Sequence, residues 1–133
     1  MSTKIEQTHN RNISQERPLR KSFGYALQGI NFFFRGERNG RLQLLIACCV
    51  FLAGILLSVS MTEWLIILLF VALVISLEML NSTLEKFCDH ISPDWHPQIK
   101  VIKDMAAGAV LWSSIMSIIA GLCIFIPKII ELL

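Results

Sequence analysis

The sequence predicts an all-α integral membrane protein, with three transmembrane helices and an amphipathic interfacial helix before the first of them. Residues 42–61 and 105–127 carry no charge, and residues 64–77 carry none before Glu78. A transmembrane helix needs about 20 mostly apolar residues, so the middle span reaches this length only by including Glu78. Hydrophobic residues make up 54% of the chain and its mean hydropathy is +0.60, values too apolar for an ordinary soluble domain. A soluble helical bundle is the alternative, and the lack of a polar face on the first and third stretches disfavours it.

The N-terminal part of the chain divides into a tail and a helix. Residues 1–18 are polar and are expected to be disordered, whereas residues 19–133 are expected to form one domain. Apolar residues recur at spacings of three and four in residues 20–36, which predicts an amphipathic helix lying in the membrane interface. Packing against other protein is an open alternative for its apolar face. The residues of that face are Phe23, Ala26, Leu27, Ile30, Phe33 and Phe34.

The three spans are expected at about residues 42–61, 64–88 and 104–127. A short turn joins the first two, and a loop with two prolines, which interrupt a helix, joins the last two. Most of the twelve Lys and Arg residues precede the first span, and three others lie between the second and third. By the positive-inside rule, the N-terminus is cytoplasmic and the chain is a multi-pass protein of a bacterial inner or plasma membrane. The net charge of +2 gives no reason to expect nucleic-acid binding.

The second span ends in a row of polar groups on one helix face. A helix advances by about 100° per residue, so Asn81, Glu85 and Asp89 all lie within about 60° of Glu78. A carboxylate inside a membrane segment is costly, which favours a functional role for Glu78 over the alternative of an ordinary interfacial position. Asp89 leaves the apolar segment, and an ordinary interfacial position is an equal alternative for that residue.

These groups suit phosphoryl transfer at a membrane surface. Mg²⁺ prefers oxygen ligands and is often held by one or two carboxylates plus substrate phosphates, which Glu37 and Glu85 fit. Lys103 is placed to balance the charge of a transferred phosphoryl group. Glu78, about two helical turns deeper, is placed to take the proton of a lipid alcohol. ATP stays in water and the lipid stays in the bilayer, so the pattern points to a kinase that acts on a lipid hydroxyl.

Three motifs in this order carry a family resemblance. They are Glu37-Arg38-Asn39, Glu78-x-x-Asn81-Ser82-x-x-Glu85-x-x-x-Asp89 and Lys103-Asp104-Met105-x-Ala107-x-Ala109-Val110. Together they resemble the prokaryotic diacylglycerol kinase and undecaprenol kinase family, over roughly residues 20–127. The resemblance implies a small three-span membrane kinase that forms homotrimers with active sites shared between subunits. It also implies Mg²⁺-ATP as the phosphoryl donor and undecaprenol or diacylglycerol as the acceptor.

The resemblance also implies roles for individual residues. Glu78 takes the position of the general base, and Asn81 supports it. Glu37 and Glu85 take the positions of metal ligands. The residues implied at the nucleotide are Tyr25, Glu37, Glu85, Asp89, Asp94, His96, Lys103 and Asp104.

Some positions depart from the family pattern, and two other functions stay open. Gly40 and Gln43 stand where one branch of the family has an aromatic residue and a histidine, and Pro18 falls near a family arginine. These departures leave the binding of the lipid headgroup undefined. The alternatives to a kinase are a non-catalytic small membrane protein and an ion or proton pathway lined by Glu78, Glu85 and Asp89. An ion pathway explains neither the adjacent Lys103-Asp104 nor Glu37.

Overall fold

The computed structural model describes residues 19–132, which form helices α2 to α5 with no strand among them. The predicted disorder of residues 1–18 concerns a segment outside the described residues. The chain divides into two compact units between Phe32 and Phe33, whereas the sequence was interpreted as one domain from residue 19. The two units are therefore described one at a time.

The first unit contains most of helix α2 (Leu19–Gly36), whose final turn belongs to the second unit. The helix agrees with the predicted range of 20–36, and its apolar residues gather on one face while Lys21, Gln28 and Asn31 stand between them. Phe23 and Leu27 are largely exposed. This pattern confirms the predicted amphipathic helix, and its position in a membrane interface stays a prediction.

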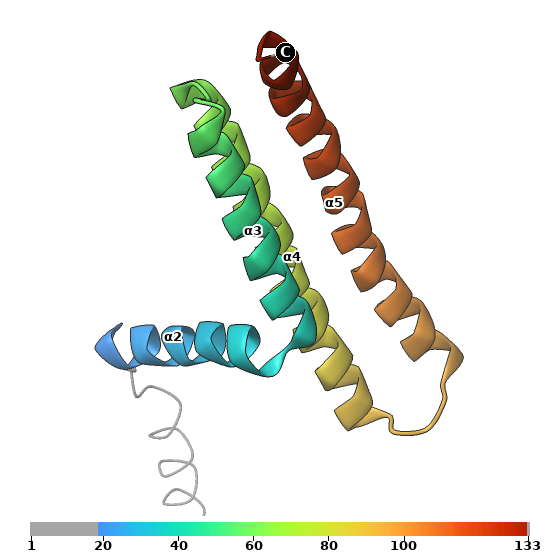
Figure 1. Ribbon diagram of the computed structural model, residues 1–133. Coiled ribbons are helices and arrows are strands. Elements are labelled where there is room, and N and C mark those ends of the chain that lie inside the picture. The colour runs from blue at the N-terminus through green and yellow to red at the C-terminus, as the bar shows by residue number, and fades with distance from the viewer. Residues whose placement is uncertain (1–18, 133) are drawn as a thin grey trace, which may run out of the picture. The chain divides into compact units, whose positions relative to one another are not determined.

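The second unit consists of helices α3 (Arg38–Leu56), α4 (Met61–Ile91) and α5 (Pro97–Glu131), which run antiparallel in succession (Figure 1). All three are long and apolar enough to cross a membrane, which confirms the three predicted spans. Few of their side chains are buried within the chain, and most of their large apolar residues are exposed. An apolar surface of this extent suits contact with lipid rather than water.

Helix α3 ends at Leu56, before the predicted end at residue 61, because the chain turns there in a Schellman motif. The N–H of Ser58 donates to Ile55 O at 3.2 Å, and the N–H of Val59 donates to Gly54 O at 3.1 Å. Ser58 has a φ of 50°, the left-handed conformation that this motif requires and that glycine usually supplies. Hydropathy alone could not show this end, since residues 57–61 are as uncharged as residues 42–56 before them.

Helix α4 begins at Met61, three residues before the predicted start, because Ser60 and Glu63 form a capping box. The N–H of Ser60 donates to Glu63 Oε2 at 2.6 Å, and the N–H of Glu63 donates to Ser60 Oγ at 3.4 Å. These bonds satisfy backbone groups that the helix itself leaves unpaired. The same carboxylate accepts an ion pair from Lys128 near the end of α5, at 3.2 Å. This contact joins α4 and α5 at one end of the second unit.

The opposite end of the second unit holds the start of α3, the end of α4 and the start of α5, and is called the site end below. Helix α5 is continuous from Pro97 to Glu131, so the predicted third span at 104–127 is the central part of a longer helix. Pro97 occupies the first turn, where its missing N–H costs no hydrogen bond. The site end therefore carries most of the charged residues of the three helices.

Candidate functional site

Helix α4 presents a buried polar face at the site end. Glu78, Asn81 and Ser82 are only 4%, 6% and 8% exposed, and Glu85, one turn further on, is half-buried. Their spacing of three and four residues places them on one face, as the sequence predicted. Buried polar groups in a helix of this hydropathy are costly unless they are paired or used.

The Glu78 carboxylate is paired with a residue of another helix. Asn39, in the first turn of α3, donates a hydrogen bond from Nδ2 to Glu78 Oε1 at 2.5 Å. Asn39 is itself exposed, whereas Glu78 is buried. The amide therefore lies between the surroundings of the protein and the buried carboxylate.

Asn81 has one satisfied and one unsatisfied group. Its Nδ2 donates to Glu85 Oε1 at 3.3 Å, which links two predicted site residues one turn apart. Its Oδ1 is buried and has no hydrogen-bond partner among the described residues. Buried polar atoms are nearly always paired in folded proteins, so an unpaired oxygen indicates a place where a ligand group is expected.

Glu37 lies at the start of α3 and pairs with the end of α4. Its Oε1 is 2.8 Å from Lys86 Nζ, and its side chain is 24% exposed. Lys86 directly follows Glu85 on α4. The ion pair therefore connects Glu37, one predicted metal ligand, to the residue next to Glu85, the other. The structure thus brings Glu37 to the same end as Glu78, Asn81 and Glu85.

Two ion pairs involve the first turns of α5. Lys103 Nζ lies 2.8 Å from Asp89 Oδ1, which joins the start of α5 to the end of α4. Lys100 Nζ lies 2.5 Å from Asp104 Oδ2 within α5. The side chains of Asp89 and Asp104 are largely exposed, and both carboxylates are therefore open to a bound molecule.

Three predicted nucleotide-binding residues take no part in these contacts. Asp94 lies in the loop before α5, where its backbone carbonyl accepts from Ser92 Oγ at 3.1 Å. His96 is the N-cap of α5, and its Nδ1 accepts from the N–H of Gln98 at 3.2 Å. Tyr25 is exposed on α2 in the first unit. Their proposed contacts with a nucleotide stay predictions.

The oxygen atoms at the site end fit a hard cation. Among the described residues, no three His, Cys, Asp or Glu side chains gather closely enough to hold a metal by themselves. Mg²⁺ does not need such a set, since it commonly uses one or two carboxylates together with substrate phosphates and water. The Glu85 and Glu37 carboxylates and the unpaired Asn81 Oδ1 offer the required ligand type.

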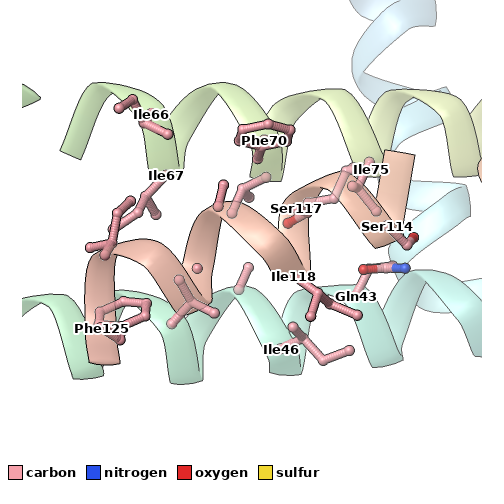
Figure 2. Close-up of a pocket in the computed structure, with 17 residues that line it drawn as sticks. Gln43, Ile46, Ile66, Ile67, Phe70, Ile75, Ser114, Ser117, Ile118 and Phe125 are labelled. Carbon is pink, nitrogen blue, oxygen red and sulfur yellow. The ribbon is translucent and has the colours of Figure 1, made fainter. Parts of the chain in front are cut away.

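An apolar pocket lies among α3, α4 and α5 next to this polar end. Its volume is about 190 Å³, and most of its lining side chains are apolar. Figure 2 shows Gln43, Ile75 and Ser114 at one end of the pocket and Ile67 and Phe125 at the other. Ile75 precedes Glu78 by three residues and Gln43 follows Asn39 by four, so this end of the pocket begins one helical turn from the Asn39–Glu78 pair.

Two residues that the structure places in the site had no functional role in the sequence analysis. Asn39 stood within the first motif, and Lys86 was one of the three basic residues counted between the second and third spans. Each pairs with a residue far away in the sequence, Glu78 and Glu37 respectively. Charge and motif position draw attention to such residues, but only helix packing identifies their partners.

The departures at Gly40 and Gln43 have structural consequences. A Cβ atom at Gly40 would lie 2.5 Å from Phe33 O, so a larger residue fits at the start of α3 only if the backbone shifts. Gln43 contributes a polar side chain to one end of the pocket. Pro18 lies outside the described residues.

Comparison with known proteins gives consistent matches. Residues 24–125 match the model of a family described as prokaryotic diacylglycerol kinase. The chain is 43% identical over 109 residues to a Bacillus subtilis protein named undecaprenol kinase. This alignment covers 82% of this chain and 89% of the relative. It is 33% identical over 130 residues to a Synechocystis protein named diacylglycerol kinase, covering 89% and 74% of the two chains. A Pseudomonas aeruginosa protein of the same name is 35% identical over 86 residues, covering 65% and 70%.

Proposed function

Because the chain belongs to the prokaryotic diacylglycerol kinase family and is a lipid kinase of the membrane, we propose that it phosphorylates undecaprenol with Mg²⁺-ATP at the cytoplasmic interface. The observation that carries this proposal is the buried Glu78 carboxylate, which lies between an apolar pocket and the charged groups of the site end. A lipid hydroxyl approaches such a carboxylate from the bilayer, and a nucleotide approaches from water.

In the proposed reaction, Glu78 accepts the proton of the lipid hydroxyl while that oxygen attacks the γ-phosphorus of ATP. One O–P bond forms to the lipid, the bond from the γ-phosphorus to ADP breaks, and the proton passes to the Glu78 carboxylate. A Mg²⁺ ion held at the site end with ATP would supply positive charge that offsets the negative charge on the phosphate oxygens. Glu37 and Glu85 would hold this ion, with Asn81 Oδ1 as a further oxygen that has no partner within the chain.

The charged residues beyond Glu78 are assigned to the nucleotide. Lys103 lies at the start of α5, where its ammonium group is paired with the exposed Asp89 and can exchange that partner for a phosphate. Asp104, Asp94, His96 and Tyr25 are proposed to contact the rest of ATP. No glycine-rich phosphate loop exists in the sequence, so side chains must provide this binding.

The choice of undecaprenol rests on similarity and on the pocket. The Bacillus subtilis relative named undecaprenol kinase is 43% identical, against 33% and 35% for two relatives named diacylglycerol kinase. The pocket is lined mainly by apolar side chains and is narrow at 190 Å³, which suits part of one extended hydrocarbon chain. Diacylglycerol is the second candidate acceptor, because the family model carries that name.

The assembly and orientation belong to the same proposal. We place the N-terminus and the loop before α5 on the cytoplasmic side, since most basic residues lie there. A homotrimer with shared active sites is proposed from the family resemblance. The exposed apolar faces of α3, α4 and α5 leave ample surface for contact between subunits.

The test is a phosphorylation assay in lipid vesicles with labelled ATP and purified protein. Equal mole fractions of undecaprenol and diacylglycerol are offered separately and then together, with and without Mg²⁺. We expect labelled undecaprenyl phosphate to predominate in the mixture and to require Mg²⁺. Exclusive labelling of diacylglycerol would overturn the assignment of the acceptor, and labelling of neither lipid would overturn the proposed reaction.

A further inference from the structure

We infer that Asn39 is a positioning residue that holds the Glu78 carboxylate in place for proton transfer. The inference rests on the proposed function of Glu78 and adds Asn39, a residue to which the sequence motif assigned no role. The supporting contact is the hydrogen bond from Asn39 Nδ2 to Glu78 Oε1, which crosses from α3 to α4.

The position of Asn39 is fixed by its own neighbours. The N–H of Glu37 donates to Phe33 O at 3.1 Å, and the N–H of Arg41 donates to Glu37 O at 3.3 Å. Gly40 is buried directly against Phe33, where no larger residue fits without a shift of the backbone. The first turn of α3 is therefore held at a defined distance from Phe33, and the Asn39 side chain starts from a constrained backbone.

The hydrogen bond from Asn39 leaves one oxygen of the Glu78 carboxylate available to accept a proton. Asn39 engages Oε1, so Oε2 is available for the proton of a substrate hydroxyl. A side-chain amide donates hydrogen bonds but does not accept a proton at neutral pH, so Asn39 does not compete with Glu78 as a base. A lysine or arginine in its place would pair with the carboxylate as an ion and would oppose its protonation.

Burial makes this control necessary. Glu78 is 4% exposed and has apolar residues on both sides in α4, so its carboxylate has little contact with water that could hold it in one orientation. Misplacement of a catalytic group by about 1 Å can cost about 100-fold in rate. A fixed donor on a second helix is a direct way of preventing such misplacement.

The test compares Asn39→Ala and Asn39→Gln with a matched control, Asn31→Ala. Asn31 is an exposed asparagine on α2 outside the proposed site. We expect Asn39→Ala to lower kcat by about 10-fold to 100-fold, a part of the 10²–10⁴-fold that a general base contributes. The KM for Mg²⁺-ATP should change by less than about 3-fold, and Asn39→Gln, which keeps an amide donor, should recover part of the lost kcat.

A double-mutant cycle separates positioning from a merely structural role. If Asn39 acts through Glu78, then Asn39→Ala has little further effect on turnover in a Glu78→Gln background. A structural role instead predicts equal fold-losses in both backgrounds, together with a lower temperature of thermal unfolding in detergent. Equal losses, or a kcat of Asn39→Ala within 2-fold of the wild type, would overturn the inference.

A second measurement does not depend on turnover. A hydrophobic carbodiimide reacts with carboxyl groups in membrane segments, and mass spectrometry of peptides locates the modified residue. We expect Asn39→Ala to raise the rate of modification at Glu78 several-fold, while Asn31→Ala leaves it unchanged and Glu78→Gln abolishes it. Equal rates of modification in Asn39→Ala and the wild type would contradict the inference about Asn39. A failure of the wild type to phosphorylate any lipid would instead count against the proposed function.

Discussion

The carboxylates of this protein differ sharply in burial, and the roles proposed for them follow this difference. Glu78 is 4% exposed, whereas the side chain of Asp89, eleven residues further along α4, is 67% exposed. Under the proposed function, the buried carboxylate is assigned to the apolar substrate, and the exposed one to water, ions or the nucleotide. Glu85 lies between these extremes, which suits contact with both.

The residue that the proposed mechanism depends on most is Glu78. Glu78→Gln keeps size and an acceptor oxygen for Asn39 but removes the base, so phosphoryl transfer should fall by at least about 10²-fold. Binding of Mg²⁺-ATP should be nearly unchanged, as measured by calorimetry in detergent. The temperature of unfolding should stay equal or rise, because a carboxylate in a membrane segment is costly. More than about a tenth of wild-type turnover would show that Glu78 is not the base.

Glu85 should matter for the metal rather than for the proton. Glu85→Gln removes a charged oxygen ligand while the side chain can still interact with Asn81, so the fold should be retained. We expect Mg²⁺-dependent nucleotide binding to weaken by about 10-fold or more, since Mg²⁺ binding relies on carboxylate charge. Glu131→Gln, at the end of α5, is the control and should bind normally. An unchanged Mg²⁺-ATP affinity of Glu85→Gln would remove Glu85 from the set of ligands.

The sequence predicted the polar face of α4 but not its partners. The spacing of Glu78, Asn81 and Glu85 follows from the helical repeat, which is local information. The contact of Asn39 with Glu78 joins residues 39 positions apart and depends on how α3 packs against α4. The unpaired Asn81 Oδ1 is likewise visible only once the neighbouring helices are in place.

At the scale of the helices, the ends of each element are set by capping rather than by hydropathy. The Schellman motif at Ser58 and the capping box at Ser60 shift the predicted boundary between the first two spans by several residues. The Ser60-x-x-Glu63 pattern can be recognised in the sequence. The left-handed backbone at Ser58 could not be predicted, because a serine stands where a glycine usually marks this conformation. Helix existence was therefore predictable, and helix ends only in part.

A substitution at Gly40 tests whether the close approach of the start of α3 to Phe33 contributes to stability. Gly40→Ala places a Cβ 2.5 Å from a backbone oxygen, so the junction must shift. Strain of this kind typically costs about 1–3 kcal/mol in the free energy of unfolding. The shift should also displace the neighbouring Asn39 and lower turnover. Unfolding is followed by circular dichroism in detergent.

Gly108→Ala is the matched control for that change. Gly108 lies within α5, where an added Cβ would meet no other helix, and no side chain beyond its chain neighbours, within 4 Å. Alanine favours a helix interior over glycine by about 0.5–1 kcal/mol, so this variant should be equally or more stable. If both variants unfold at the same temperature as the wild type, the close approach at Gly40 has no energetic importance.

At the scale of the whole molecule, the charge distribution predicts orientation in the membrane. The loop that contains Asp94 follows α4, and Thr62 lies at the other end of the same helix. In a cysteine-free background, Asp94→Cys should react with a membrane-impermeant maleimide only from the cytoplasmic side. Thr62→Cys should react only from the opposite side. The reverse pattern would invert the proposed topology and separate the site from cytoplasmic ATP.

The position of the pocket among three spanning helices determines which measure of substrate concentration governs the rate. Under the proposed function, the lipid substrate enters this pocket from the bilayer and diffuses in two dimensions. Its relevant concentration is then its fraction of the surrounding lipid rather than its amount per volume of solution. Adding inert lipid or detergent at constant total substrate therefore slows the reaction, while adding water does not. Rates measured in different carriers become comparable only when they are expressed against that surface fraction.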